Sequence, residues 1–587
     1  MRPRSQGYHA GRALFVGFLL LLAWSVMITR IVSLHLDATR RAKVLSSRNY
    51  RTALAASRGW IFDRTGKPMA LDVTLKNVCV DPARILSEGV ARPVSAHLAR
   101  LLGQKPADVY SAITNRATRR YAAIAKQRPE ADAAAIARLR LPGVFSEDVS
   151  VRQYPMGTLG CHVFGFVNAE GVGSSGLEQR YDDLLRGLPG LLLGEKDGRR
   201  REILTRRSLD AAPVPGANIH LTLDATIQYY VEKALDEAMV HTNFNPEAVW
   251  AVVEDVRTGE ILAMASRPAY DLNAYATSTP EQRRNRAIAA NIEPGSIFKT
   301  ATVAAALDAG VIETGQVFFC ENGYWRDCPG RPLKDFHAYG DLDVGGVLKK
   351  SSNIGAAKIA ILLGPERFRR YLADFGIGRP TGIELPGEEA GILHPLSAWT
   401  SPSISRVAMG HEVMVTALQM VNLLSCIGND GYLMQPHIVS RIEDPSGRVL
   451  FQNAPRVLRR PITERTAAQM RALLRGVTRP DGTGKQAAIE GYPVAGKTGT
   501  AEKLVNGHYV RNSNVASFMG MFPADSPRIA IIVVADDPHP YHGGGAVSAP
   551  IFARIAAPVA RYLDIPPVDA SDVIYYTPDG LPVPDDA

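Results

Sequence analysis

The chain has 587 residues, of which 46% are hydrophobic and 21% are charged. This length excludes a single small binding module, and the near-average composition argues against a disordered, collagenous or multi-span membrane protein. The 67 Lys and Arg residues outnumber the 58 Asp and Glu residues only slightly for this length. Because no dense basic block with interleaved aromatics is present, we expect no nucleic-acid partner.

An apolar run near the N-terminus predicts a membrane anchor. Residues 13–29 contain no charged side chain, and a bilayer core needs roughly 17 to 25 helical residues. The run ends in Met27, Ile28, Thr29 and Arg30 without an A-x-A-like cleavage site. We therefore interpret residues 13–36 as an uncleaved transmembrane helix. Basic residues lie on both sides of it, so charge alone leaves its orientation open.

Residues 37–215 form the next predicted module, an irregular α+β domain without obvious chemistry. Its first part, 37–57, is polar and basic and is expected to continue as a helical stalk. Residues 58–70 place turn residues between two short apolar runs, as a hairpin would. Residues 93–142 are rich in Ala, Arg and Leu at helical spacing and predict a small helical insertion. Two prolines and a glycine within 211–218 mark the domain boundary.

The sequence pattern of residues 216–565 indicates a second domain, with predicted strands at both of its ends. Between these ends lie about 230 residues dominated by helical patterns. We predict an α+β fold with an antiparallel sheet built from both ends and packed by helices. Asp224 is expected to cap a helix over 226–239. The expected strands are 219–223, 249–253, 261–264, 516–522 and 529–534. Residues 566–587 hold five prolines and no Lys or Arg, and we interpret them as a flexible acidic tail.

The five cysteines show no C-x-x-C pair and no spacing typical of metal ligands. We therefore expect no metal, no cofactor and no scaffold built from disulfides. The cysteines are Cys79, Cys161, Cys320, Cys328 and Cys426.

The first candidate for chemistry is Ser296, which precedes Lys299 by three residues at the start of an apolar helix. This spacing stacks the two side chains on one helix face, so the amine can reach the hydroxyl. A lysine desolvated by an apolar helix can have its pKa lowered enough to take the serine proton. The helix N-terminus adds a positive field for a developing oxyanion.

Two further groups of polar residues follow along the chain. Ser351 and Asn353, two residues apart, offer a proton relay and a hydrogen-bond partner for a substrate amide. Lys497-Thr498-Gly499-Thr500 follows an apolar run and is expected to be an edge strand. Its glycine lets another backbone approach closely, and its lysine and threonines can bind a carboxylate.

In this order, S-x-x-K, S-x-N and K-T-G resemble the active-serine signature of penicillin-binding proteins and class A β-lactamases. The resemblance extends from residue 13 to about 560. Over this range the sequence is most similar to the division-specific, or septal, branch of the class B penicillin-binding proteins. The segments that carry it are RGWIFDRTGKPMALDV, RQYPMG, GLEQRYDDLL, EDVRTGEILAMASRPAYD, GIELPGEEAG, MVTALQM and GGGAVSAPIF.

The resemblance implies a serine D,D-transpeptidase that cross-links peptidoglycan stem peptides and is a target of β-lactams. Ser296 would attack the carbonyl of the penultimate D-Ala and release the terminal D-Ala, with Lys299 as its base. Ser351 would relay protons to the leaving amine. Asn353 would hold the substrate amide.

The substrate carboxylate would be bound by the third motif, through Lys497, Thr498 and Thr500 around Gly499. The backbone N–H groups of Ser296 and Thr500 would form the oxyanion hole. An amine from a neighbouring stem would then attack the acyl-enzyme and join two strands.

Cross-linking occurs outside the cytoplasmic membrane, so the resemblance settles the topology. It implies a cytoplasmic tail over 1–12 and a periplasmic or extracellular remainder anchored by a single pass. No glycosyltransferase module precedes residue 216. The resemblance therefore implies a SEDS-family glycan polymerase and other divisome membrane proteins as partners.

Three alternatives stay open at this point. An elongation-specific class B enzyme would share all three motifs. A β-lactamase would need an efficient deacylating base, and a catalytically silent division scaffold would not need Ser296, Lys299 and Lys497 together.

Two features depart from the family pattern or add to it. His411 stands where a small or apolar residue is expected, and we interpret it as a solvent-facing loop residue. Cys320 and Cys328 lie eight positions apart. In an oxidising compartment they could close a small disulfide loop.

Overall fold

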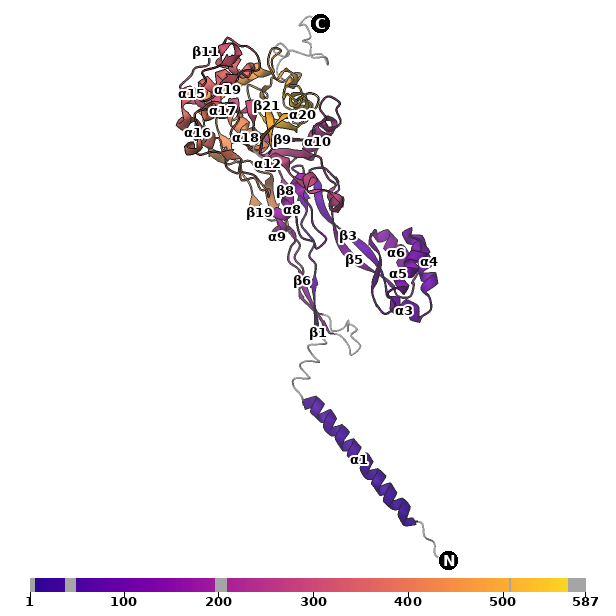
Figure 1. Ribbon diagram of the computed structural model, residues 1–587. Helices are drawn as coiled ribbons and strands as arrows, with labels where there is room; N and C mark the ends of the chain where they lie inside the picture. The colour runs from indigo at the N-terminus through magenta and orange to yellow at the C-terminus, as the bar shows by residue number, and fades with distance from the viewer. Residues whose placement is uncertain (1–5, 37–48, 196–207, 506–507, 568–587) are drawn as a thin grey trace, which may run out of the picture. The chain divides into compact units, whose positions relative to one another are not determined.

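A computed structural model of the protein describes residues 6–36, 49–195, 208–505 and 508–567 (Figure 1). The chain divides into two compact units. One comprises residues 1–57 and 187–215, and the other comprises residues 58–186 and 216–587. Most of the predicted tail, from residue 568 onward, and the first five residues of the predicted cytoplasmic segment lie outside the described residues.

The first unit contains the apolar helix α1 (Gln6–Leu36). Its segment Ala10–Leu36 has a mean hydropathy of 2.2 and is long and apolar enough to cross a bilayer, in agreement with the predicted anchor. The rest of this unit is an antiparallel sheet in the order β1-β6-β7. Its strands are β1 (Asn49–Leu54), β6 (Gly190–Glu195) and β7 (Ser208–Ala211).

The predicted helical stalk over 37–57 is wrong where the structure can test it. Residues 37–48 lie outside the described part of the chain, but residues 49–54 form β1. Tyr50 and Thr52 favour strand conformation, and β1 pairs along its whole length with β6, more than a hundred residues away. This long-range pairing has no signal in the local sequence.

In the second unit, the predicted hairpin at 58–70 is present. β2 (Ile61–Phe62) pairs antiparallel with β3 (Pro68–Val80), and Asp63 accepts hydrogen bonds within the turn. β3 continues for thirteen residues and pairs over ten of them with β5 (Val144–Gln153).

The predicted helical insertion over 93–142 is correct for three helices but wrong for 122–128. The helices are α4 (Ala91–Leu102), α5 (Pro106–Thr114) and α6 (Glu130–Arg138), preceded by α3 (Pro82–Ser87). Residues 122–128 form β4, which pairs with β3. This pairing buries Ala122 and Ala125 among the apolar side chains of α4 and α5, so tertiary packing overrides alanine's helix preference.

A seven-stranded sheet joins this region to later parts of the chain. Its order is β19-β18-β8-β2-β3-β4, with β5 paired to β3. The added strands are β8 (Asn218–Leu221), β18 (Val439–Glu443) and β19 (Val449–Gln452). Because segments before and after residue 216 share one sheet, the boundary between the predicted domains 37–215 and 216–565 stays a prediction.

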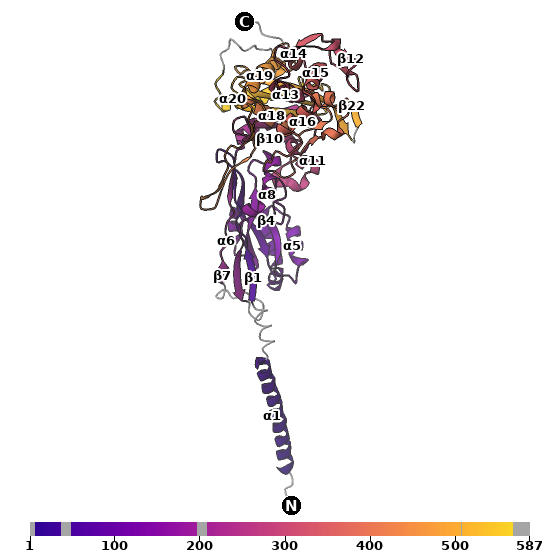
Figure 2. The same ribbon diagram turned by 90° about the vertical axis from the view of Figure 1, so that its left-hand side faces the viewer.

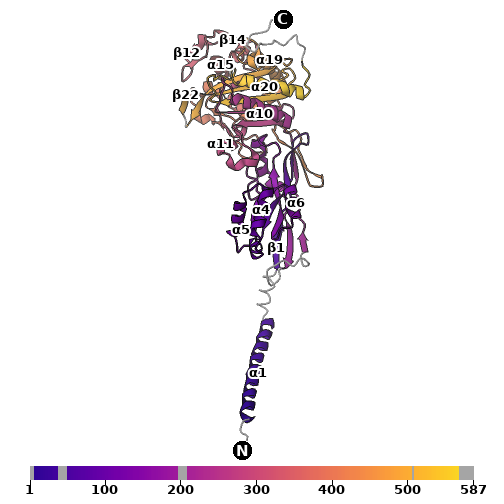
Figure 3. The same ribbon diagram turned by 90° about the vertical axis from the view of Figure 1, so that its right-hand side faces the viewer.

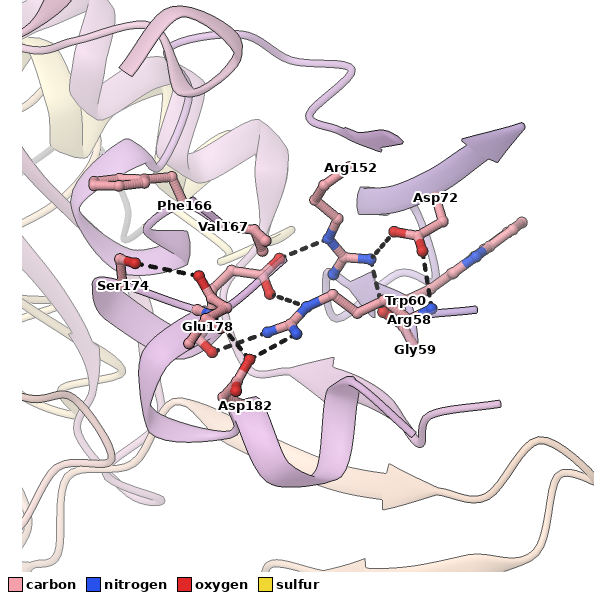
Figure 4. Close-up of polar contacts among 12 residues, drawn as sticks. Arg58, Gly59, Trp60, Asp72, Arg152, Phe166, Val167, Ser174, Glu178 and Asp182 are labelled. Atoms are coloured by element: carbon pink, nitrogen blue, oxygen red, sulfur yellow. Dashed lines mark hydrogen bonds and ion pairs between the residues drawn. The ribbon is translucent and has the colours of Figure 1, made fainter. Parts of the chain in front are cut away.

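A buried ion network ties three separate segments together (Figure 4). Glu178 is fully buried and lies between two guanidinium groups, 2.6 Å from Arg58 Nε and 2.7 Å from Arg152 Nε. Arg58 also contacts Asp182, and Arg152 contacts Asp72. These side chains come from β3, β5, α8 (Gly176–Arg180) and α9 (Asp182–Leu185), together with the segment preceding β2. The network therefore links these elements of the second unit through charged groups that are buried away from water.

The predicted antiparallel sheet of the later region is present, in the order β10-β9-β23-β22-β21. As expected, its strands come from both ends of that region. They are β9 (Ala248–Asp255), β10 (Ile261–Arg267), β21 (Ala495–Val505), β22 (His508–Phe522) and β23 (Ile529–Asp536). Strand β21 is an edge strand, as the K-T-G segment predicted.

Helices cover both faces of this sheet. α10 (Ala225–Met239) and α20 (Ser548–Tyr562) pack on one face, which is turned to the viewer in Figure 3. Asp224 caps α10 by accepting from Thr226 N and Ile227 N, as predicted. α18 (Ala417–Gly428) packs on the other face, and the remaining helices gather beyond it (Figure 2). They are α13 (Lys299–Asp308), α14 (Val344–Lys349), α15 (Asn353–Leu363), α16 (Pro365–Asp374), α17 (Ser403–Ala408) and α19 (Glu464–Arg475).

The five cysteines are free and buried. The hypothetical disulfide between Cys320 and Cys328 is therefore absent from this structure. Both thiols instead lie in a small apolar cluster with Leu333 and Ile354. Cys320 Sγ is 3.4 Å from the hydroxyl of Ser352, so it serves as packing beside the second motif.

Candidate active site

Ser296 lies in a tight turn that is clamped between two other segments. The turn is the 3-10 helix Gly295–Phe298, directly before α13. Gly295 has a φ of 54°, and a Cβ on it would come within 2.7 Å of the Thr500 carbonyl. Its N–H donates to the carbonyl of Gly410 at 3.2 Å. The close approach of β21 and of the Gly410 loop thus holds the serine at the head of α13.

Lys299 is the first residue of α13, and its side chain is fully buried. Its Nζ lies 3.0 Å from Ser296 Oγ, 2.6 Å from the Ser351 carbonyl and 2.7 Å from Asn353 Oδ1. The carbonyl and the amide oxygen can only accept, so they use both N–H groups of a neutral amine. The nitrogen lone pair is then left for the two neighbouring hydroxyl groups, those of Ser296 and Ser351.

The electrostatics of the site favour that neutral amine. Burial lowers the pKa of Lys299 to about 7, and the negative charge of Asp335 opposes this only in part. Lys497 is also fully buried. Burial, and after it the charge of Lys299, holds the pKa of Lys497 well below its ordinary value. Two ammonium groups so close together in a desolvated site disfavour each other.

Ser351 connects the two lysines. Its Oγ lies 3.2 Å from Lys299 Nζ and 3.0 Å from Lys497 Nζ. The residue has a φ of 61°, in the left-handed region, where it joins α14 to α15. In that conformation both its carbonyl and its hydroxyl lie within hydrogen-bond distance of the Lys299 amine.

Asp335 supports the second motif, although no pattern in the sequence indicated this role. Its carboxylate accepts from Ser352 Oγ at 2.6 Å and from the N–H groups of Asn353 and Ile354 at the start of α15. The carbonyl of Lys334 accepts from Asn353 Nδ2 at 2.9 Å. A lone aspartate in a loop has no periodicity or spacing that could have marked it as a cap for a helix eighteen residues later.

The third motif lies along β21, and its threonine side chains contact two neighbouring segments of the chain. Thr498 Oγ1 donates to Thr483 Oγ1 at 3.0 Å, and Thr500 Oγ1 accepts from Gly544 N at 3.2 Å. Gly499 lies between them, facing the segment that carries Ser296. The structure thus brings together all eight predicted site residues, namely Ser296, Lys299, Ser351, Asn353, Lys497, Thr498, Gly499 and Thr500.

Replacing Gly499 with alanine is expected to slow acylation of Ser296 by a penicillin by about 10²-fold. A Cβ there would come within 2.3 Å of Ser517 Oγ and 3.0 Å of the Pro294 carbonyl, so the serine turn must shift. Gly476→Ala is the control, because its Cβ would meet nothing nearer than 4.0 Å. Stopped-flow or gel-based acylation rates measure both variants, and equal rates would show that the close approach is unimportant.

The rate of acylation is expected to rise with pH and to reach half of its plateau near pH 7. Below the Lys299 pKa of about 7 the amine is protonated and cannot accept the Ser296 proton, whereas above it the lone pair is free. Acylation rates across pH 5 to 9 test this. A profile that is flat through this range, or that falls, would contradict the assignment of Lys299 as the base.

His411 is a loop residue as predicted, but it faces solvent only in part, because its side chain is 28% exposed. Its Nδ1 lies 2.7 Å from the buried carboxylate of Glu293, and its ring meets Tyr509 edge-on. Tyr509 also donates to Glu293 at 3.1 Å. Glu293 lies three residues before Ser296, so its contacts with His411 and Tyr509 stabilise the segment that carries the serine. His411 itself forms no hydrogen bond with Ser296 or Lys299 among the described residues.

Comparisons with known proteins agree with this geometry. A family model described as the penicillin-binding protein transpeptidase domain matches residues 249–557, and one described as the penicillin-binding protein dimerisation domain matches residues 53–221. The peptidoglycan D,D-transpeptidase FtsI of Escherichia coli is 33% identical over 583 residues, which cover 96% of this chain and 95% of FtsI. The chain belongs to the class B penicillin-binding proteins.

Other relatives carry different names within the same family. The probable peptidoglycan D,D-transpeptidase PenA of Neisseria meningitidis is 34% identical over 88% of this chain and 86% of its own. The stage V sporulation protein D of Bacillus subtilis is 34% identical over 85% of this chain and 77% of its own. Among solved structures, penicillin-binding protein 3 of Mycobacterium tuberculosis, complexed with aztreonam, has a TM-score of 0.69 at 27% identity. That match covers 89% of this chain and 99% of the other.

The predicted fold class, an α+β protein with an N-terminal apolar helix, a dimerisation-type module and a transpeptidase domain, is confirmed. The predicted enzyme class, peptidoglycan D,D-transpeptidase, is confirmed as well.

Proposed function

We propose that this penicillin-binding protein cross-links peptidoglycan stem peptides through an acyl-enzyme on Ser296. The observation that carries the proposal is the buried Lys299 amine, 3.0 Å from Ser296 Oγ, with both its N–H groups directed elsewhere. Ser296 Oγ attacks the carbonyl carbon of the penultimate D-Ala while Lys299 takes its proton. The amide C–N bond then breaks, and the leaving amine of the terminal D-Ala receives a proton.

Ser351 is proposed to deliver that proton, because its hydroxyl lies within hydrogen-bond distance of both lysine amines. Asn353 is proposed to orient the substrate amide, since its side chain is fixed by the Lys334 carbonyl. In the second half of the reaction the amine of a neighbouring stem attacks the ester. That step forms the cross-link and restores the hydroxyl of Ser296.

The β21 edge is proposed to hold the substrate through its carboxylate and its developing oxyanion. Lys497, Thr498 and Thr500 supply cation and hydroxyl groups for the terminal carboxylate. The N–H groups of Ser296 and Thr500 are proposed as the oxyanion hole, a role supported by the close packing of the Gly295 turn on the Thr500 carbonyl. β-Lactams would acylate the same serine.

Cross-linking is tested with the full chain, a SEDS-family polymerase and lipid-linked peptidoglycan precursor. The proposal expects cross-linked muropeptides and free D-Ala from the wild type, and neither from Ser296→Ala. Uncross-linked strands from the wild type as well as from the variant, although penicillin acylates the wild type normally, would favour a different acceptor or a silent scaffold. Slow release of the penicilloyl group is expected, and rapid turnover would instead favour a β-lactamase.

The cellular role is proposed to be septal, with α1 as a single-pass anchor, the N-terminus inside and the catalytic region outside the cytoplasmic membrane. The relation to FtsI over nearly the full length of both chains supports this role. A SEDS-family polymerase and other divisome proteins are the proposed partners, with α1 and the first module as docking surfaces. Depletion should then give filaments with unfinished septa, whereas rounded cells would favour the elongation-specific alternative.

A further inference from the structure

The loop before the second motif exposes a large aromatic side chain without a packing role. Phe336 is 91% exposed, between β13 (Leu333–Lys334) and β14 (Asp341–Asp343). Burying such a ring against a ligand is favourable in free energy, so Phe336 is able to stabilise a bound molecule.

This loop is fastened to the active site at several points. Asp335, the neighbour of Phe336, caps α15 through Ser352 and Asn353, and the Lys334 carbonyl accepts from the side chain of Asn353. The N–H of Asp335 also donates to the Gly323 carbonyl at 3.1 Å. A ligand that contacts the side chain of Asn353 and extends toward this loop therefore meets Lys334 and Phe336 next.

The surface there is an open depression that is lined by aromatic side chains and by one side chain of each charge. Phe336, His337, Tyr324, Lys334 and Asp335 line this depression of about 330 Å³, which we call the Phe336 depression. Lys334 Nζ lies 5.3 Å from the centre of the Tyr324 ring. Within the described chain, no carboxylate forms an ion pair with it, and the carboxylate of Asp335 is already used by α15. Among the described residues, the depression thus offers an ammonium group without an ion-pair partner beside two aromatic faces.

We infer that the Phe336 depression binds the acidic stem peptide of the substrate, upstream of its D-Ala–D-Ala end. This inference rests on the proposed function and extends it to a substrate subsite. Lys334 pairs with a free carboxylate of the stem, and the faces of Phe336 and Tyr324 cover its aliphatic part. These contacts lie away from the scissile bond. Their binding energy can therefore be used to position that bond for attack by Ser296.

The test is competition between peptides and a fluorescent penicillin on the full-length chain. One competitor is a stem pentapeptide, and the other is an N-acetylated D-Ala–D-Ala dipeptide that is too short to reach the depression. In Phe336→Ala and in Lys334→Gln, protection by the pentapeptide should weaken by about tenfold. Protection by the dipeptide, and the rate of acylation of Phe336→Ala without any peptide, should change less than about twofold. Tyr229→Ala on α10, another exposed aromatic, is the matched control.

Three results would overturn the inference. Unchanged protection by the pentapeptide in both variants would show that the depression does not contact the stem. Equal weakening of both competitors would place the effect at the catalytic groups. A pentapeptide that does not protect the wild type, although penicillin acylates it normally, would exclude the subsite and leave Ser296 as the nucleophile. Absence of acylation in the wild type would instead refute the proposed function itself.

Discussion

Replacing Lys299 with methionine should slow acylation of Ser296 by a penicillin by about 10²- to 10⁴-fold, the contribution expected of a general base. Methionine fills much the same volume in this buried position but cannot accept a proton. Second-order acylation rates with a fluorescent penicillin measure the effect. Lys358→Met is the control, because that amine, on the same helix as Asn353, pairs with Glu321 away from the serine. It should acylate within about twofold of the wild type.

A second substitution separates proton transfer from simple positive charge. Lys299→Arg keeps a cation but cannot become neutral near pH 7, since the guanidinium pKa exceeds about 12. We therefore expect Lys299→Arg to be about as slow as Lys299→Met. If arginine restored acylation while methionine did not, the lysine would act as a charge and another group would be the base.

Replacing Glu178 with glutamine should lower the free energy of local opening around the buried ion network by about 3 to 5 kcal/mol. The substitution leaves Arg58 and Arg152, each 6% exposed, without their shared carboxylate. Native-state hydrogen exchange of the amides of β3 and α8 measures this free energy. The expected cause is the desolvated charge left behind, not the loss of a single hydrogen bond.

Asp183→Asn is the matched control for that measurement. Its carboxylate is 88% exposed and pairs at 2.7 Å with Arg186, the C-cap residue of α9. A surface pair of this kind contributes about 0 to 1 kcal/mol because water solvates both partners. Similar losses in the two variants would show that Glu178 does not hold the segments together.

The sequence predicted the site better than it predicted the framework around it. Ser296 and Lys299 form a local pair, so helical spacing alone placed them together. The approach of Lys497 to Ser351 depends on the pairing of strands from opposite ends of the chain. Only the order of three motifs, compared with a known family, anticipated it.

The failures share one physical cause, which is that long-range contacts decided the local structure. β1 and β4 are strands because distant partners pair with them, and the alanine-rich sequence of β4 by itself favours a helix. Asp335 was missed because a capping carboxylate far from its helix has no local pattern. Arg58, Arg152 and Glu178 each lie in a segment that resembles the family, yet nothing in those segments indicated that they meet.

The most direct test of the account is the intact mass of the full-length chain after incubation with a penicillin, beside the Ser296→Ala variant. We predict that the wild type gains the mass of one penicillin molecule and that the variant gains none. An adduct on Ser296→Ala, or none on a folded wild type, would contradict Ser296 as the nucleophile.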